Sequence, residues 1–292
     1  LTATRGALLS RRNVKVIQTL AFTVGPLEEE EPGGTWRIAP AVLVPVDVEL
    51  GAEDAGLHEG TDVETDAVVE IGVPAKGLLG KGLPAHENVE RRVLGLTNPG
   101  LKKTGHFATT PNLVAAIQLI LPGETALAHH HTPAALRIII EGEGAYTCTN
   151  GERCWMEPGD LILTPAWSYH DHKNEGNGPM LWLDGLDVPL IDAMDTIFFE
   201  LYPGKRTQPQ TQADQASMAR FAAPGMRPAN FSWDKNYSPL TKYPWKNMVQ
   251  ALDGMLASDA NPYDDLRLEY FNPHTGGPVM PTIACYAQKL RA

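Results

Sequence analysis

Short runs of apolar residues, separated by glycine and proline, fill the chain from residue 112 to residue 186. The strand candidates are LVAAIQLIL (113–121), ALRIIIEG (135–142), AYTCT (145–149), DLILTP (160–165) and MLWLDGL (180–186). They follow one another at roughly ten-residue spacing, and the dipeptide Asn150-Gly151 is a strong hairpin signal. The pattern predicts an antiparallel sandwich or barrel.

The pattern changes after residue 187. Residues 188–201 place apolar side chains at helical spacing, and Pro189 is tolerated in a first helical turn, so we predict a helix here. Residues 203–232 are rich in Gln, Pro, Ala and Ser and are predicted to be irregular. A second helix is predicted over residues 245–256, and residues 268–292 return to strand and turn character.

The first part of the chain gives weaker signals. Residues 27–35 (LEEEEPGGT) predict a loop, because charge repulsion and Gly/Pro both oppose packing. Residues 1–27 carry basic side chains and no acid, which fits a transit peptide, whereas the β-branched stretch 14–24 fits an N-terminal strand. A cytoplasmic location is expected, with an organellar location as the alternative.

Composition narrows the classes of partner. The net charge of −11 disfavours nucleic acid and anionic membrane as partners, and no apolar run is long enough to span a bilayer. The three cysteines (Cys148, Cys154 and Cys285) form no CxxC pair, so neither a disulfide framework nor a thiolate zinc site is expected. A reducing compartment is therefore the default.

Candidate chemistry lies in two histidine clusters. His129 and His131 are two residues apart, so on a strand both can face the barrel interior while His130 faces out. His170 follows a later strand candidate and can complete a face of three imidazoles. Neutral imidazole suits iron, zinc, copper or nickel, and three ligands without an obvious fourth predict an open, catalytic metal site. The alternative is that the histidine run is a solvated loop.

The residues around the histidines decide between these interpretations. Residues 123–144, with G-x5-H-x-H followed by G-x-G, resemble the first cupin motif, and residues 158–174, with P-G-D followed by Pro, His and Asn, resemble the second. Many cupins place a glutamate ligand shortly after the H-x-H pair. Here Ala134, Ala135 and Leu136 occupy those positions, so the site keeps the full charge of the cation and favours an anionic chelating substrate.

The resemblance is closer than the cupin fold alone. Segments from residue 91 to residue 192 resemble the gentisate 1,2-dioxygenase family, which includes salicylate and 1-hydroxy-2-naphthoate dioxygenases; SPLTKYPW (238–245) and LEYFNPHTGGPVMPT (268–282) also resemble it. The resemblance implies an Fe(II)-dependent, extradiol-type dioxygenase with one mononuclear ion per chain and O2 as co-substrate. Such an enzyme opens the ring of gentisate or a related 2-hydroxy aromatic carboxylate between the carboxyl- and hydroxyl-bearing carbons.

The same resemblance assigns roles to residues. It places His129, His131 and His170 at the positions of the iron ligands. The positions that the family uses around the substrate are occupied here by Gln118, Arg137, His172 and Asp184.

Physical arguments support three of these roles. Arg137 is six residues from His131, so on an unbroken strand it faces inward, where it can pair with the substrate carboxylate; the alternative is a surface ion pair. His172 can share the face of His170 and act as an acid–base group. Asp184 either holds a histidine or Arg137, or is a turn residue before Gly185.

Four further residues are weaker candidates for substrate contact. Arg91 and Arg92 can reach the substrate, although such a pair is more often solvated. Trp167 and Trp182 can line the pocket, although core packing is expected for at least one of them.

The predicted organisation is mainly β. A poorly assigned segment (1–85) precedes a metal-binding cupin, a double-stranded β-helix or jelly-roll barrel (86–190). A helical and irregular linker (191–267) leads to the start of an incomplete second cupin (268–292). A homo-oligomer is expected from the family. The alternatives are a non-catalytic cupin that binds a metal or small ligand, and a different metal-dependent cupin enzyme.

Overall fold

The computed structural model describes residues 18–19, 92–96, 98, 101, 108–204 and 207–289. The chain divides into two compact units, residues 1–88 and 89–292. In the first unit the structure describes only strand β1 (Gln18–Thr19). The expected loop at 27–35, most of the basic N-terminal segment and Arg91 therefore lie outside the described residues.

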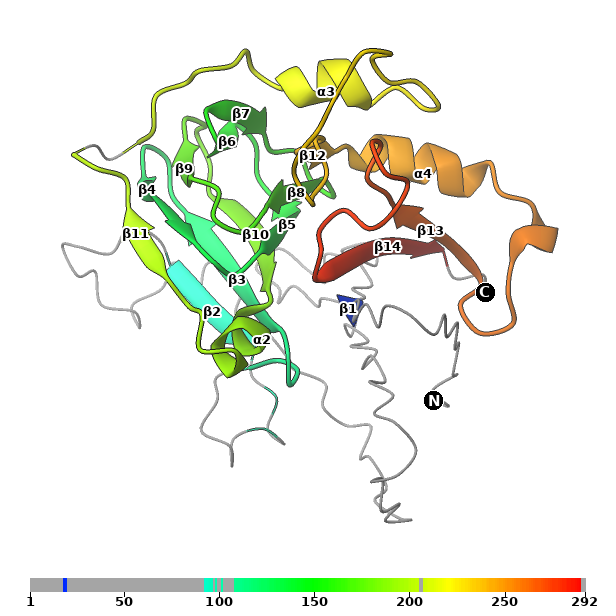
Figure 1. Cartoon of the computed structure of the whole chain (residues 1–292), viewed down its shortest axis with the longest axis horizontal. Coiled ribbons are helices and arrows are strands. Elements are labelled where there is room, and N and C mark those ends of the chain that lie inside the picture. The colour runs from blue at the N-terminus through cyan, green and yellow to red at the C-terminus, as the bar shows by residue number, and fades with distance from the viewer. Residues whose placement is uncertain are drawn as a thin grey trace, which may run out of the picture. The chain divides into compact units, whose positions relative to one another are not determined.

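The second unit contains a β-barrel (Figure 1). Its strands are β2 (Arg92–Leu96), β3 (Val114–Ile120), β4 (Thr125–His131), β5 (Ala135–Glu141), β6 (Ala145–Thr149), β7 (Glu152–Trp155), β8 (Leu161–Thr164), β9 (His170–Asn174) and β10 (Met180–Leu186). All five strand candidates of the sequence pattern are strands in the structure, within a residue or two at their ends.

Two antiparallel sheets form this barrel. One has the strand order β12-β8-β5-β10-β3-β2, where β12 is Lys242–Tyr243. The other has the order β11-β4-β9-β6-β7, where β11 is Phe199–Leu201. The predicted mainly-β cupin architecture is confirmed. The strands that carry the histidines, β4 and β9, are neighbours in the second sheet, and Arg137 and Asp184 lie on neighbouring strands of the first, β5 and β10.

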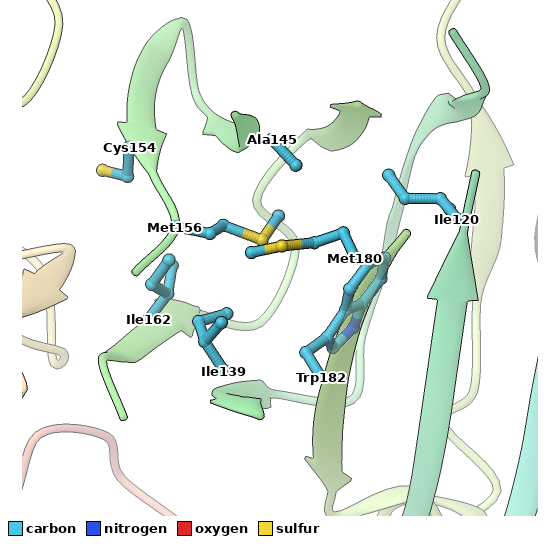
Figure 2. Packing of buried hydrophobic residues seen from close by; sticks show 8 residues of the cluster. All are labelled: Ile120, Ile139, Ala145, Cys154, Met156, Ile162, Met180 and Trp182. Atoms are coloured by element: carbon cyan, nitrogen blue, oxygen red, sulfur yellow. The ribbon is translucent and has the colours of Figure 1, made fainter. Parts of the chain in front are cut away.

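The side chains that line the barrel interior are apolar at one end of the strands and polar at the other. On β10, Met180, Trp182 and Asp184 alternate onto one face. The apolar members belong to a buried cluster that also includes Met156 (Figure 2). The whole cluster is Ile120, Ile139, Ala145, Cys154, Met156, Ile162, Met180 and Trp182. Polar side chains continue the same faces, so the apolar cluster closes one end of the barrel and supports a polar site beyond it.

The turn between β6 and β7 has the predicted hairpin geometry. Asn150 and Gly151 both have positive φ, 47° and 81°, as a two-residue type I′ turn requires. A Cβ on Gly151 would overlap the side chain of Thr211, so close packing also selects glycine here. The hairpin sets the register that pairs Thr147 with Cys154.

The predicted helix over residues 188–201 is wrong in its second half. Helix α2 spans only Val188–Ala193, with Pro189 in its first turn, and Asp195 takes a left-handed φ of 54° that ends helical continuation. Residues Phe199–Leu201 form strand β11, which pairs with β4. The backbone hydrogen bonds of an otherwise open sheet edge outweigh the helical spacing of the apolar residues.

The C-terminal part contains more helix than predicted. Residues 203–232, predicted to be irregular, include helix α3 (Ala216–Phe221). Strand β12 (Lys242–Tyr243) is followed by α4 (Trp245–Asp253), which ends three residues earlier than predicted, and by a 3-10 helix (Ala257–Asp259). Strands β13 (Leu266–Tyr270) and β14 (Ile283–Lys289) pair antiparallel. None of the helices in the described part of the chain is long and apolar enough to cross a membrane.

A buried lysine attaches this C-terminal part to the barrel. Strand β12 pairs with β8, and the Lys242 side chain is 2% exposed. Its Nζ donates to Asp160 Oδ2 at 2.6 Å, Glu157 Oε2 at 3.3 Å and the Trp155 carbonyl at 2.7 Å. All three ammonium protons thus have acceptors. Asp160 also accepts from the Trp245 amide at 2.9 Å, which fixes the start of α4.

Candidate metal centre and active site

Three histidines converge inside the barrel. His129 on β4 is the register partner of His170 on β9, so the two side chains share a face of the sheet. His131 lies two residues further along β4. One nitrogen from each ring lies within 4.8 Å of the others, a spacing that can hold one metal ion. His129 and His170 are buried, and His131 is half-buried.

Backbone carbonyls set the tautomer of each ring. The Nδ1 atoms of His129, His131 and His170 lie 2.7, 2.7 and 2.9 Å from the carbonyl oxygens of Leu127, Pro133 and Ser168. A carbonyl only accepts, so Nδ1 must carry the proton, and the lone pair of the neutral ring is on Nε2. This is the arrangement that orients imidazoles as metal ligands.

Electrostatics favour the neutral, ligating form of His170. Burial lowers its pKa well below the usual histidine value, and Arg137, His129 and His131 lower it further. The donor set therefore fits a divalent transition metal: three neutral imidazoles and no carboxylate in the group. The positions that would carry a glutamate ligand belong to the buried apolar residues Ala134, Ala135 and Leu136.

His130 faces away from this group, as predicted. Its ring stacks on Trp167 and Tyr169, with centroid distances of 3.8 and 3.9 Å, and its Nε2 lies 3.0 Å from Glu200 Oε2. The structure thus places Trp167 with His130, on the side opposite the ligand group and 44% exposed. A substrate contact by Trp167 stays a prediction.

Arg137 and Asp184 form a buried ion pair beside the histidines. Arg137 Nε lies 3.1 Å from Asp184 Oδ1, and each side chain is 3% exposed. The guanidinium also donates to Thr164 Oγ1, and Gln118 Nε2 donates to Asp184 Oδ2. Asp184 is a mid-strand residue of β10, so the structure excludes the turn alternative and pairs Asp184 with Arg137.

The spacing argument for Arg137 rested on a wrong premise. Strand β4 ends at His131, and β5 starts at Ala135 in the other sheet, so no unbroken strand joins His131 and Arg137. Arg137 is buried because of its own register on β5, where it is the partner of Asp184.

His172 lies near both the ligand His170 and the apolar cluster that contains Trp182. Its ring centroid is 5.8 Å from that of His170 and 5.2 Å from that of Trp182. Its Nδ1 lies 3.0 Å from Thr147 Oγ1. Sequence analysis missed Thr147 and Thr164. For Thr147, the signal was present as alternation in AYTCT, where residues 145, 147 and 149 share one face.

Two buried polar atoms near His172 have no hydrogen-bond partner among the described residues. They are Gln118 Oε1 and Trp182 Nε1, on side chains 8% and 0% exposed. Gln118 and Trp182 are register partners on β3 and β10. An unsatisfied buried acceptor and an unsatisfied buried donor on neighbouring strands indicate a place for water or for a polar ligand.

The remaining candidates lie elsewhere. Arg92 on β2 pairs with Glu124 at 2.9 Å, so its guanidinium is already held by a carboxylate. A separate cavity of about 480 Å³ lies beside α3, α4 and β13, and none of the predicted site residues lines it.

Known proteins resemble this chain in sequence and in structure. A family model described as a cupin domain matches residues 116–187. The gentisate 1,2 dioxygenase 1 of Aquipseudomonas alcaligenes is 43% identical over 205 residues, which are 70% of this chain and 58% of that protein. A gentisate 1,2-dioxygenase of a Haloferax species is 32% identical over 256 residues, which are 83% of this chain and 68% of that protein.

Solved structures agree with these relatives. The salicylate 1,2-dioxygenase of Pseudoaminobacter salicylatoxidans, determined as an adduct with gentisate, has a TM-score of 0.64 and 39% identity; the match covers 72% of this chain and 58% of that protein. The chain thus spans just over half the length of several of the relatives that it matches.

Proposed function

Because the chain belongs to the gentisate 1,2-dioxygenase family, we propose that it acts as an Fe(II)-dependent ring-cleaving dioxygenase on gentisate or a related 2-hydroxy aromatic carboxylate. The bond cleaved lies between the carboxyl- and hydroxyl-bearing carbons. The observation that carries the proposal is the convergence of His129, His131 and His170 beside a buried arginine.

The three histidines hold the iron in this proposal. The lone pairs are on Nε2 because the Nδ1 protons are bonded to backbone carbonyls, and one ring nitrogen of each histidine lies within 4.8 Å of the others. Bound there, iron(II) would supply Lewis acidity and electron transfer for the reaction of dioxygen with the ring. With three protein ligands the site would be open, as catalytic metal sites are, rather than closed like a structural one.

Arg137 selects an anionic substrate. A guanidinium can bind a carboxylate through two parallel hydrogen bonds. This interaction is strongest where water is excluded. Asp184 holds Arg137 by its Nε and is itself held by Gln118, so the guanidinium is oriented before the substrate arrives.

His172 would transfer protons in this reaction, and the apolar cluster would keep water out of the site. His172 accepts the proton of the ring hydroxyl and returns a proton to the product, as a general acid–base group. The side chain of Trp182 and the cluster behind it exclude bulk water from this end of the barrel. The unpartnered Gln118 Oε1 accepts from a substrate hydroxyl or a bound water.

The domain organisation is part of the proposal. We assign residues 86–190 as the metal-binding cupin, 191–267 as a linker that returns to the barrel through β12, and 268–292 as the start of a second cupin. The antiparallel pair β13–β14 supports the last assignment. Self-association follows from the family and is tested by light scattering.

A pair of neighbouring histidines gives a matched test of the metal site. The protein is reconstituted anaerobically with iron(II), and bound iron is measured for wild type, His131→Gln and His130→Gln. We expect about one iron per chain in wild type and in His130→Gln, because His130 faces outward. His131→Gln should lose iron by 10-fold or more in affinity, since one of three ligands is gone. Equal iron in both variants would contradict the site.

Oxygen uptake then tests the reaction. The substrates are gentisate, salicylate and 1-hydroxy-2-naphthoate, and formation of the ring-opened product is followed by its absorbance. Uptake with one of the three supports the proposal and identifies the substrate variant. Stoichiometric iron without uptake of oxygen for any of them would instead favour a non-catalytic, ligand-binding cupin. Elemental analysis of the protein as purified tests the choice of iron over other metals.

A further inference from the structure

The hydrogen-bond partner of Nδ1 distinguishes His172 from the three ligand histidines. For the three ligands it is a carbonyl oxygen, which accepts and never donates. For His172 it is the hydroxyl of Thr147, at 3.0 Å. A hydroxyl both donates and accepts, so either neutral tautomer of His172 keeps this hydrogen bond.

The packing fixes this hydroxyl in place. Thr147 is the register partner of His172 on the adjacent strands β6 and β9, and both residues are almost completely buried, at 0% and 1% exposed. A β-branched side chain on a strand has few rotamers, so Oγ1 has little freedom to leave Nδ1. The Trp182 ring lies 5.2 Å from the imidazole and limits its rotation.

We propose that Thr147 is a positioning residue for His172: its hydroxyl, fixed on β6, holds the imidazole ring in one orientation beside the ligand group. The proposal rests on the dioxygenase function proposed above and deepens it. A hydroxyl suits this positioning role because it can stay hydrogen-bonded to Nδ1 whether that nitrogen donates or accepts.

The same strand offers a matched control. Thr149 is two residues from Thr147, faces the same side and is the register partner of the ligand His170. Its hydroxyl is buried and has no hydrogen-bond partner among the described residues. Replacing an unpartnered buried hydroxyl by a methyl group of the same shape is nearly neutral. Thr147→Val and Thr149→Val therefore make the same chemical change, and only the first removes a contact to His172.

The kinetic test uses the iron-loaded protein and a graded series at position 147. Thr147→Ser keeps the hydroxyl, Thr147→Cys replaces it by a weaker thiol, and Thr147→Val removes it. We expect kcat to fall in that order, to roughly a tenth of wild type or less in Thr147→Val, with KM and iron content within about twofold. Thr149→Val should keep wild-type kcat. A Thr147→Val protein as active as wild type, or losses that are equal at the two positions, would overturn the proposal.

A second measurement is independent of turnover. In the zinc-substituted protein labelled with 15N-histidine, ring nitrogen shifts report the tautomer, and His172→Gln assigns the signals. We expect the ligand rings to carry Nδ1–H in every variant. The His172 shifts should change in Thr147→Val and be restored in Thr147→Ser. His172 shifts that are identical in wild type and Thr147→Val would refute the contact. If wild type shows no turnover but the shifts respond as expected, the reaction assignment fails while the positioning contact stands.

Discussion

Replacing Lys242 by methionine should destabilise the protein without touching the metal site. Methionine keeps most of the buried stem of the lysine and removes only its charge. The change leaves the Asp160 carboxylate, which is 3% exposed, without the ammonium that lies 2.6 Å away. The decrease in the free energy of unfolding therefore measures what a buried, fully hydrogen-bonded lysine contributes to the attachment of β12 to the barrel.

The magnitude follows from the contacts that remain. Removing one partner of a buried ion pair costs about 3–5 kcal/mol. Asp160 keeps two backbone donors, the amides of Glu157 at 3.2 Å and Trp245 at 2.9 Å, so we expect the lower end, about 3 kcal/mol. For a domain of this size that loss lowers Tm by roughly 6–12 °C.

The loss should also depend on pH. Burial raises the pKa of Asp160, and Lys242 opposes that rise. Without Lys242 the folded-state pKa moves further above the unfolded value of about 4. Between the two values the folded state holds a proton that the unfolded state lacks, so the stability of the variant falls as pH rises through this window. The difference from wild type should be smaller at pH 5 than at pH 8.

Denaturant unfolding at both pH values provides the measurement. Lys235→Met is the matched control, because Lys235 and its partner Asp234 are exposed, at 51% and 83%, and the same substitution there should change stability by less than about 0.5 kcal/mol. Adding Asp160→Asn to Lys242→Met should recover stability by removing the unpaired charge. A Lys242→Met protein as stable as Lys235→Met at pH 8 would refute the reasoning.

Three further outcomes are expected. Arg137→Lys should raise KM for gentisate by roughly tenfold or more, because lysine cannot bind a carboxylate through two parallel bonds, while bound iron stays stoichiometric; an unchanged KM would remove Arg137 from the substrate site. Gly151→Ala should cost about 1–3 kcal/mol in denaturant unfolding, since the turn needs φ of 81° and the new Cβ meets Thr211; an unchanged midpoint would mean that the turn can rearrange. Burial raises the pKa of Cys148 and Cys285 to about 12, so iodoacetamide at pH 8 should label neither thiol until denaturant unfolds the protein; labelling of the folded chain would contradict their burial.

The strands and the shared face of His129 and His131 could be predicted from the sequence because their signals are local. Strand alternation places His129 and His131 on one face, and a single hairpin signal at Asn150-Gly151 fixes the register of β6 and β7. The closeness of His170 required the motif resemblance, because nothing local says which strands pair.

Long-range pairing accounts for what the sequence did not predict. The helical spacing of residues 194–201 is real, yet the open edge of β4 takes residues 199–201 as a strand. Arg137 was expected to be buried, but for a reason that the break between β4 and β5 removes. The contact of Thr147 with His172 depends on the register of β6 against β9, which no single segment encodes.

Strand β11 has a consequence for how firmly the ligands are held. It pairs with β4 on the side away from β9. The pairing begins where the Thr132 amide donates to the Phe198 carbonyl and ends where the Tyr202 amide donates to the Ala128 carbonyl. Strand β4, which bears two of the three ligands, is therefore hydrogen-bonded to a strand on each side. We expect its backbone amides to exchange with deuterium among the slowest in the barrel. Substitutions that destabilise the segment between α2 and β11 would weaken the pairing of β11 with β4. Such substitutions, more than sixty residues from the ligands in sequence, can therefore lower the affinity for the metal ion.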